Sequence, residues 1–141
     1  MTSLVVDDGV TNDDGGSSMD WKLELIAIPV SDVDRAKAFY GEKAGFNIDH
    51  DHTVSEEMRF VQVTPPGSAC SIAFGRGIVD SPVGSVQGLQ LVVPDIETAR
   101  KELAGRGVDV SEIADLDWGS FVYFRDPDGN GWAVQQSPGR K

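Results

Sequence analysis

The pattern of hydrophobic positions divides most of the chain into two similar halves. Each half opens with an apolar, β-rich run, at residues 23–30 and at residues 89–93. Each run is followed by apolar residues at the three- and four-residue spacing of one helix face. These residues are Val33, Ala36, Phe39 and Tyr40 in the first half, and Ile96, Ala99 and Leu103 in the second. The pattern therefore predicts a strand and then an amphipathic helix in each half.

Polar residues and glycines mark the predicted ends of both helices. Ser31 or Asp32 can begin the first helix and Asp95 the second, because a side-chain oxygen there accepts bonds from the exposed N–H groups of the first turn. Gly45 and Gly107 end the helices, because glycine readily takes the left-handed conformation that follows a helix. Both helices are thus bounded by residues suited to those ends.

Three further strands are predicted after each helix, in an arrangement that repeats. They cover residues 47–52, 58–63 and 70–74 in the first half, and residues 109–113, 121–125 and 131–136 in the second. Strong turn signals join the last two strands of each half, Pro-Pro-Gly-Ser at 65–68 and Asp-Pro-Asp-Gly-Asn at 126–130. The sequence therefore predicts an α+β protein of two tandem βαβββ modules, residues 20–75 and 86–137, with a linker rich in Gly, Pro and Ser between them.

Composition and charge narrow the class of protein. The chain has 141 residues, of which 40% are hydrophobic, so it can form one packed domain, which we place at residues 20–137. Residues 1–19 are rich in Asp, Gly and Ser without periodicity, and they predict a disordered acidic tail. The formal net charge of -11 opposes binding to nucleic acids and to anionic membrane surfaces.

A cytoplasmic location is expected from the cysteine content and from the absence of targeting signals. Cys70 is the only cysteine, so no disulfide can form within the chain. No apolar run approaches the roughly 18 residues of a membrane span. The first residues also lack the basic and apolar stretches of a secretory signal. We therefore expect no membrane partner.

Two stretches of the chain carry a family likeness. The first is Ile-Pro-Val-Ser-Asp-Val-Asp-Arg-Ala-Lys-Ala-Phe-Tyr at 28–40 with Gly-Phe at 45–46, and the second is Phe-Arg-Asp-Pro-Asp-Gly-Asn at 124–130. Together with the repeated βαβββ order, they resemble the glyoxalase/bleomycin resistance protein/dioxygenase superfamily, which has the vicinal oxygen chelate (VOC) fold. The resemblance covers residues 20–137. It implies a curved, mostly antiparallel eight-stranded sheet around a cleft, and a homodimer.

The resemblance also implies where a divalent metal would be held. The family typically uses a histidine on the first strand of each module and a glutamate or glutamine on the last. Those positions fall at Leu25, at Gly88, at Ala133 and near residues 71–73. Leu, Gly and Ala offer no side-chain donor to zinc, iron or nickel. We therefore predict no metal and no other cofactor, although a one-residue shift would bring Glu24 or Gln90 to a ligand position.

Other catalytic chemistry finds little support in the sequence. His50 and His52 share one face of a predicted strand, but no third metal ligand accompanies them, and a polar strand end is the simpler interpretation. Neither histidine is placed as a base beside a serine or cysteine nucleophile. No glycine-rich phosphate loop opens either helix. The sequence therefore names no catalytic residue.

Strand alternation, extended from the family positions, predicts which residues line the cleft. They are Leu25, Ala27, Arg59, Gln62, Ser71, Ala73, Gln90, Val92, Trp118, Tyr123, Ala133 and Gln135. Arg59 and Gln62 have opposite parity on one strand, so only one of them can point inward. Trp118 is included as a loop residue able to cover a ligand. Leu89 and Trp132 have the opposite, helix-facing parity and are predicted to lie in the core.

Such a cleft is mostly apolar with a few amides and hydroxyls, which is typical of a site for an organic ligand. The sequence therefore favours a protein that binds a small organic molecule in a metal-free cleft, and the resemblance to bleomycin-resistance proteins implies drug or metabolite sequestration. The alternative is an enzyme, a glyoxalase-like lyase or isomerase or a dioxygenase, with a metal or a metal-free active site. A third interpretation is a non-catalytic interaction module with a filled cleft.

Overall fold

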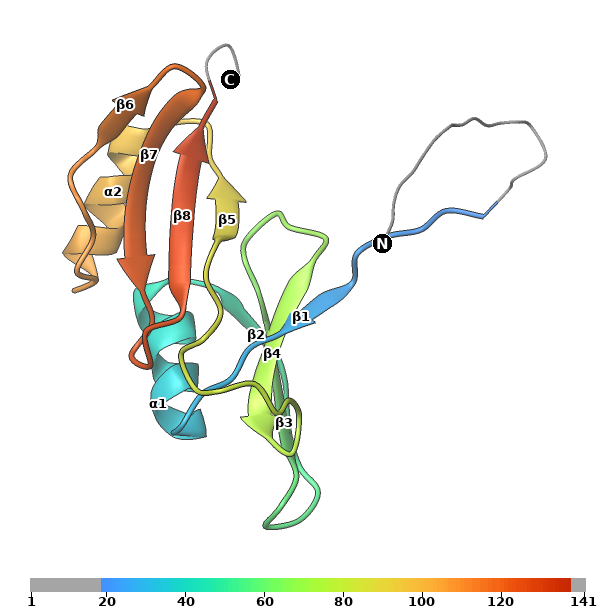
Figure 1. The fold of residues 1–141 in the computed structure, drawn as a ribbon. Helices are drawn as coiled ribbons and strands as arrows, with labels where there is room; N and C mark the ends of the chain where they lie inside the picture. The colour runs from blue at the N-terminus through green and yellow to red at the C-terminus, as the bar shows by residue number, and fades with distance from the viewer. Residues whose placement is uncertain (1–18, 138–141) are drawn as a thin grey trace.

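The computed structural model describes residues 19–137 and confirms the two βαβββ modules (Figure 1). The first module contains β1 (Leu25–Ala27), α1 (Val33–Ala38), the π-helical turn η2 (Phe39–Lys43), β2 (Asn47–Thr53), β3 (Arg59–Thr64) and β4 (Ser71–Arg76). The second contains β5 (Leu89–Val92), α2 (Ile96–Gly105), β6 (Ala114–Leu116), β7 (Gly119–Arg125) and β8 (Gly131–Gln136). Of the predicted tail, residues 1–19, only Met19 lies within the described residues.

Both helical segments begin and end with the residue types that the sequence predicts. Asp32 accepts a bond from the backbone N–H three residues later, and Asp95 accepts one from the N–H two residues later, each at 3.1 Å. The backbone enters the left-handed region at Gly45 and Gly107, with φ of 82° and 91°. Asp32 is therefore the cap of the first helix. Between residues 19 and 137, neither helix has the length and apolarity needed to cross a bilayer.

One predicted strand is misplaced. Residues 109–113 are not a strand, and β6 follows them as a short strand at Ala114–Leu116. Ser111 explains the difference, because its hydroxyl oxygen accepts a bond from Tyr123 N at 2.9 Å while its own N–H donates to Tyr123 O at 2.9 Å. A side-chain oxygen thus replaces a backbone carbonyl beside β7 and interrupts the regular ladder.

The eight strands form two four-stranded sheets. Sheet A has the order β1-β4-β3-β2 and sheet B has the order β5-β8-β7-β6. In each sheet the first pair, β1 with β4 or β5 with β8, is parallel, and the other two pairs are antiparallel. The α+β class and the tandem modules are thus confirmed, with the strands divided between two mixed sheets in place of one continuous eight-stranded sheet.

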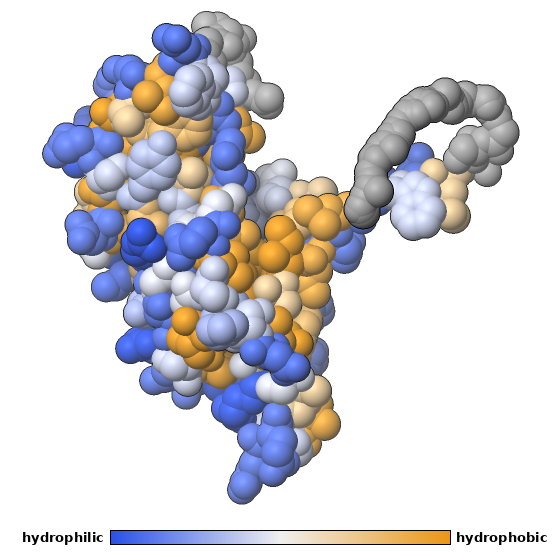
Figure 2. Space-filling model, viewed as in Figure 1, coloured by the Kyte–Doolittle hydropathy of each residue, from blue (hydrophilic) through white to orange (hydrophobic). Residues whose placement is uncertain are grey.

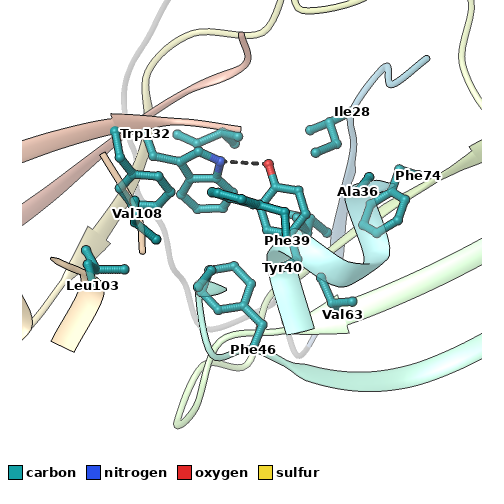
Figure 3. Packing of buried hydrophobic residues seen from close by; sticks show 14 of the residues in the cluster. Ile28, Ala36, Phe39, Tyr40, Phe46, Val63, Phe74, Leu103, Val108 and Trp132 are labelled. Carbon is teal, nitrogen blue, oxygen red and sulfur yellow. Dashed lines mark hydrogen bonds between the residues drawn. The ribbon is translucent and has the colours of Figure 1, made fainter. Parts of the chain in front are cut away.

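A shared hydrophobic core lies between the two sheets and explains why they are separate (Figure 3). Tyr40 of η2 contacts Phe74 of β4 and Trp132 of β8, with ring centroids 5.6 Å and 5.9 Å apart. Phe46 also packs against Trp132 at 5.6 Å. Leu89 and Trp132 are buried, as predicted. Because large aromatic side chains fill the space between the sheets, the sheets meet through side-chain packing and not through backbone hydrogen bonds.

The turn between β7 and β8 joins the two modules through buried polar groups. Asp126 is 4% exposed and Asn130 is 0% exposed. Tyr40 Oη donates to Asp126 Oδ2 at 2.8 Å. Trp132 Nε1 donates to Tyr40 Oη at 3.0 Å, the bond that Figure 3 shows. Asn130 Nδ2 donates to Pro29 O at 2.9 Å. Burial and the neighbouring Asp126 carboxylate raise the pKa of Tyr40 well above its usual range. The sequence predicts this turn but not its role as a link between modules.

Candidate ligand-binding site

Each sheet has one face packed on the core and one face that the helices leave open. The open face of sheet B carries one row formed by Gln90, Ala133 and Tyr123, and a second row formed by Val92, Gln135 and Phe121. The open face of sheet A carries a row formed by Ala27, Ala73, Gln62 and His50, with Leu25 beside Ser71 in the next row. Strand register therefore places most of the predicted cleft residues on the faces that alternation assigns to them.

A hollow of about 720 Å³ lies at the end of β7 and the start of β8 and includes two of these residues, Tyr123 and Ala133. It is lined by Gln87, Gly88, Asp109, Ser111, Tyr123, Phe124, Arg125, Asp126, Gly131, Trp132 and Ala133. Tyr123 and Ala133 belong to the predicted cleft, and Gly88 is one of the positions where the resemblance places a family metal ligand. The volume lies within the range of small-molecule sites. We therefore take this hollow as the candidate site within one chain.

Arg125 adds a positive charge to the hollow, which is also lined by the carboxylate residues Asp109 and Asp126. Its Nη1 donates to Gln87 Oε1 and to Gly129 O, both at 3.2 Å. Within residues 19–137, no Asp or Glu oxygen lies within ion-pair distance of its guanidinium. The neutral amide and carbonyl hold the side chain in place and leave other N–H donors unused. Arg125 can therefore donate hydrogen bonds to a planar anionic group of a ligand.

Tyr123 and Phe121 form an aromatic ledge on the same face of β7. Their rings are stacked with an interplanar angle of 2° and centroids 6.0 Å apart. Phe121 is 6% exposed, whereas Tyr123 is 44% exposed. Phe121 therefore supports the ring of Tyr123 from the inner side, and Tyr123 offers a flat surface on which an aromatic ligand can stack.

The open face of sheet A carries side chains that bond to one another. Gln62 Nε2 donates to Ser71 Oγ at 3.4 Å, and Ser71 Oγ shares a hydrogen bond with Thr64 Oγ1 at 2.6 Å. The Thr64 hydroxyl in turn donates to Asp49. Ser71 is 5% exposed and Ala73 is 0% exposed. Because these side chains already satisfy one another, this face offers fewer free groups to a ligand than sheet B does.

Arg59 lies apart from the other predicted cleft residues. Its guanidinium pairs with Asp51 at 2.9 Å and with Asp34 of α1 at 2.8 Å, and Lys37 pairs with the same Asp51 at 2.8 Å. Hydrogen bonds from Arg59 and then from Lys37 lower the pKa of Asp51 below its usual range. Gln62, with the opposite parity, is the inward-pointing residue of the pair. The prediction that Arg59 lines the cleft is corrected, because it faces the helix side of the sheet.

The remaining predicted residues fall into two groups instead of one cleft. Sheet B and its loops carry Gln90, Val92, Trp118, Tyr123, Ala133 and Gln135, while sheet A carries Leu25, Ala27, Gln62, Ser71 and Ala73. No strand of sheet A makes extensive contact with a strand of sheet B within residues 19–137. The single cleft that the sequence predicts for these residues is therefore not found in one chain, because the aromatic core lies between the sheets.

Trp118 lies in the turn between β6 and β7 and is 63% exposed. Its carbonyl oxygen accepts a bond from Gln135 Nε2 at 3.0 Å, and Gln135 Oε1 accepts one from Gln90 Nε2 at 2.6 Å. These amides connect the turn to the open face of sheet B. The turn is therefore held at the border of that face, with the indole free in solvent.

The positions that would hold the family's metal do not fit a metal ion. Leu25 lies beside Ser71 in the register of sheet A, and Ala133 lies beside Gln90 in sheet B. Carbon side chains, one hydroxyl and one amide do not make a strong donor set for a transition metal. Among residues 19–137, no three His, Cys, Asp or Glu side chains are grouped so that they could hold a metal ion. His50 and His52 stack on each other, with ring centroids 5.6 Å apart.

Nine residues of the hollow were absent from the sequence-predicted cleft: Gln87, Gly88, Asp109, Ser111, Phe124, Arg125, Asp126, Gly131 and Trp132. Arg125 has the same parity as Tyr123 on β7, so alternation could have included it. Gln87 precedes the family ligand position Gly88. Asp109 and Ser111 gave no usable signal, because the sequence places them in a strand that the structure lacks.

Two tandem βαβββ modules, each with one open sheet face, define the VOC class of fold. A family model described as the Glyoxalase/Bleomycin resistance protein/Dioxygenase superfamily matches residues 22–134. The chain belongs to this superfamily, which confirms the resemblance seen in the sequence.

Known relatives cover nearly the same span. The uncharacterized protein YetH of Bacillus subtilis (strain 168) is 27% identical over 117 residues, which is 82% of this chain and 98% of YetH. TnmS3, an antibiotic binding protein from Streptomyces sp. CB03234, is 33% identical with a TM-score of 0.77, covering 86% of this chain and 99% of TnmS3. A glyoxalase/bleomycin resistance protein from the same Streptomyces strain is 35% identical with a TM-score of 0.71, covering 82% of this chain and all of the other (100%).

Proposed function

We propose that this protein binds a small organic molecule without a metal ion and serves to sequester a drug or metabolite. The observation that carries the proposal is the hollow of about 720 Å³ on sheet B, in which an exposed aromatic ring, Tyr123, lies two residues from an unpaired cation, Arg125. An apolar surface with a few fixed polar groups is the usual composition of such sites. TnmS3, similar over most of the chain, is described as an antibiotic binding protein, which supports the same class of function.

The ligand class follows from the two side chains. Tyr123 favours a flat aromatic ring, because offset stacking adds to the burial of apolar area. Arg125 favours a carboxylate, sulfonate or phenolate on that ring, because its guanidinium carries donors for a planar acceptor. The chain as a whole is acidic, with a net charge of -11, so the binding of an anion in the hollow depends on its one cation, Arg125. We therefore expect an aromatic anion.

A binding role is favoured over metal-dependent catalysis by the residues themselves. Leu25, Gly88 and Ala133 occupy the family's ligand positions and carry no side-chain donor. The same residues remove the means by which a metal would polarise a substrate or activate water. The hollow offers Asp109, an exposed carboxylate, and no nucleophile paired with a histidine.

We further propose a homodimer in the cytoplasm. Among residues 19–137, no strand of sheet A makes extensive contact with a strand of sheet B, and a shared core lies between the sheets, so a cleft walled by both open faces needs a second copy. In such a dimer the sheet A face of one chain covers the sheet B face of the other. The single cysteine supports the location, because a reducing compartment requires no disulfide.

A titration with anilinonaphthalene sulfonate tests the proposal, because this fluorescent probe is itself an aromatic anion. Wild-type protein is expected to bind it saturably at one site per chain. Tyr123→Ala and Arg125→Gln are each expected to weaken binding about tenfold, the equivalent of about 1.4 kcal/mol. Arg76→Gln is the matched control, because it removes an exposed arginine at the end of β4.

Two results would contradict the proposed function. Binding that does not saturate, or that is unchanged in both Tyr123→Ala and Arg125→Gln, would show that the hollow is not the site. Retention of one tightly bound zinc, nickel, manganese or iron per chain after dialysis would show that the metal-free assignment is wrong.

A further inference from the structure

Arg125 is the last residue of β7 and lies close to the segment that leads into β5. This segment passes beside the β7–β8 turn (Figure 1). Over β7 and β8, hydrophilic and hydrophobic residues lie side by side on the surface (Figure 2). Val86 N donates to Asn130 Oδ1 at 3.1 Å, and Gly131 N donates to Val86 O at 2.9 Å. The backbone next to Gln87 is therefore fixed against the turn.

The side chain of Gln87 lies across this turn and holds one nitrogen of Arg125. Gln87 Nε2 donates to Gly84 O at 3.3 Å and to Gly129 O at 3.0 Å. Gln87 Oε1 accepts from Arg125 Nη1 at 3.2 Å. Because the amide nitrogen faces two carbonyls, the amide oxygen is the atom that faces the guanidinium. A β-carbon at Gly131 would lie 2.2 Å from Gln87 Oε1, so the glycine leaves room for this amide.

Both bonds from Arg125 use the same nitrogen, which leaves one edge of the guanidinium open. Nη1 donates to Gln87 Oε1 and to Gly129 O, both at 3.2 Å. Within residues 19–137, Nε and Nη2 donate no hydrogen bond to the protein. The parallel N–H groups of this Nε/Nη2 edge match the two oxygens of a carboxylate. The Gln87 amide thus holds the guanidinium without occupying the edge that can bind an anion.

The acidic residues that line the hollow do not occupy this edge either. Asp126 Oδ1 accepts from two backbone N–H groups of the turn, each at 2.9 Å. Asp126 Oδ2 accepts from Tyr40 Oη at 2.8 Å and from Asn130 Nδ2 at 2.9 Å. Asp109 is exposed and forms no ion pair with the part of the chain that the structure describes. Asp126 is therefore satisfied by groups other than Arg125.

We propose that Gln87 is a positioning residue that presents the Nε/Nη2 edge of Arg125 to an aromatic carboxylate. A carboxylate is planar and uses both N–H groups of the edge, whereas a phenolate has one oxygen and a sulfonate is not planar. A neutral amide suits this task, because a glutamate at the same position would pair with Arg125 and compete with the ligand. The inference rests on the proposed function and narrows its ligand from any aromatic anion to a carboxylate.

The spacing of Tyr123 and Arg125 indicates how such a ligand lies. They are two residues apart on the same face of β7, about 7 Å at the usual rise of a strand. A fused ring system stacked on Tyr123 can therefore carry its carboxylate toward Arg125. Naphthoate and naphthamide are a matched pair of probes, because they have nearly the same shape and differ in charge and in the second carboxylate oxygen.

Displacement of anilinonaphthalene sulfonate measures the affinity of the full-length protein for each probe. Wild type is expected to bind naphthoate at least about tenfold more tightly than naphthamide. In Arg125→Lys, which keeps the charge but lacks the planar edge, this preference should fall to about threefold or less. An unchanged preference in Arg125→Lys would show that charge alone selects the ligand, which overturns the role of the Nε/Nη2 edge.

Two substitutions of Gln87 separate positioning from charge. Gln87→Met is similar in size but removes the bonds of the amide, and it should weaken naphthoate about fivefold and leave naphthamide unchanged. Gln87→Glu places a carboxylate beside Nη1 and should abolish the preference for naphthoate. Asn47→Asp is the control for the added charge, because it introduces the same charge at an exposed position on β2 and should keep the preference.

Two further variants test whether Gln87 acts through Arg125. Gly131→Ala displaces the Gln87 amide without changing either residue, and it should reproduce the effect of Gln87→Met. Gln87→Met combined with Arg125→Gln should lose no more naphthoate affinity than Arg125→Gln alone, because coupled residues are not additive. Circular dichroism verifies that each variant is folded, and Gln87→Met tests the inference if Gly131→Ala does not fold.

The possible failures are distinguishable. Equal affinities for naphthoate and naphthamide, with normal binding of anilinonaphthalene sulfonate in the hollow, overturn the carboxylate assignment but leave the proposed function intact. An equal loss of both probes in Gln87→Met, or no loss of either, overturns the positioning role of Gln87. Absence of saturable binding of anilinonaphthalene sulfonate overturns the proposed function and, with it, this inference.

Discussion

Sheets A and B have the same strand order and the same mixture of parallel and antiparallel pairs, yet their open faces have different chemistry. On sheet A, Ser71 and Ala73 are buried and the hydroxyls and amides bond to one another. On sheet B, Tyr123 is 44% exposed and Arg125 has no carboxylate partner among the described residues. A repeated backbone therefore does not repeat the site. In the proposed site, the side chains of the second module would contact the ligand.

We expect the two modules to stabilise each other through the contacts between them. A substitution of Asn130 tests this most directly, because its side chain joins the two modules. Its side chain donates to Pro29 O and Asp126 Oδ2 and accepts from Val86 N, and it is fully buried. Asn130→Ala leaves those groups unsatisfied and is expected to lower the free energy of unfolding by about 3 kcal/mol. Urea denaturation measures the change. Asn47→Ala, at an exposed position on β2, is the control, and an equal loss there would contradict the interpretation.

The contributions of the two sheets to the stability of the shared core can be compared by substituting one buried valine in each sheet. Val61 of β3 and Val122 of β7 are both 0% exposed. Val61→Ala and Val122→Ala are each expected to cost about 2 kcal/mol of unfolding free energy. Because one core joins the sheets, both variants should shift a single thermal transition, measured by calorimetry. Two separate transitions, with each variant moving only one, would show that the modules unfold independently.

Substitutions on the two open faces should have different effects on ligand affinity. Tyr123→Ala on sheet B is expected to weaken binding of anilinonaphthalene sulfonate about tenfold, since an aromatic surface is lost. Gln62→Ala on sheet A is expected to change it by less than about twofold, because the Gln62 amide already bonds to Ser71. Fluorescence titration measures both. Equal effects at the two positions would mean that both faces contact the ligand directly.

The smallest expected effect concerns acid stability of the first module. Hydrogen bonds from Arg59 and Lys37 lower the pKa of Asp51 in the folded state, so its contribution to stability is present above the unfolded pKa of about 3.9 and is lost as pH falls below it. The contribution should be about 1 kcal/mol, because partly exposed ion pairs are screened by solvent.

Asp51→Asn should therefore lower stability at pH 7 by about this amount and remove the corresponding part of the loss on acidification. Denaturation midpoints measured between neutral and acidic pH test it, with the exposed Asp80→Asn as control. A pH dependence identical to that of wild type would show that Asp51 does not contribute.

Local features of the chain could be predicted from the sequence, whereas features that depend on distant residues could not. The helix caps Asp32 and Asp95, the terminal glycines and the β7–β8 turn could be predicted because each depends on residues only a few positions away. The failed strand at residues 109–113 had the right residue types, and the Ser111 side-chain bond to Tyr123 overrode them. Arg59 was misassigned because its partners, Asp34 and Asp51, lie on other elements.

The sequence by itself determined the tandem modules, the family, the face on which most strand residues lie and the lack of metal donors at the family positions. The modules and the strand faces follow from residue identity and from periods of two or 3.6 residues, whereas the family and its ligand positions follow from the resemblance of residues 28–46 and 124–130. Only the tertiary structure decided how the two faces are placed. Contacts such as Tyr40 with Asp126 and Asn130 with Pro29, separated by 86 and 101 residues, set the modules around one aromatic core. No local pattern encodes such contacts, because they depend on the packing of side chains brought together by the whole fold.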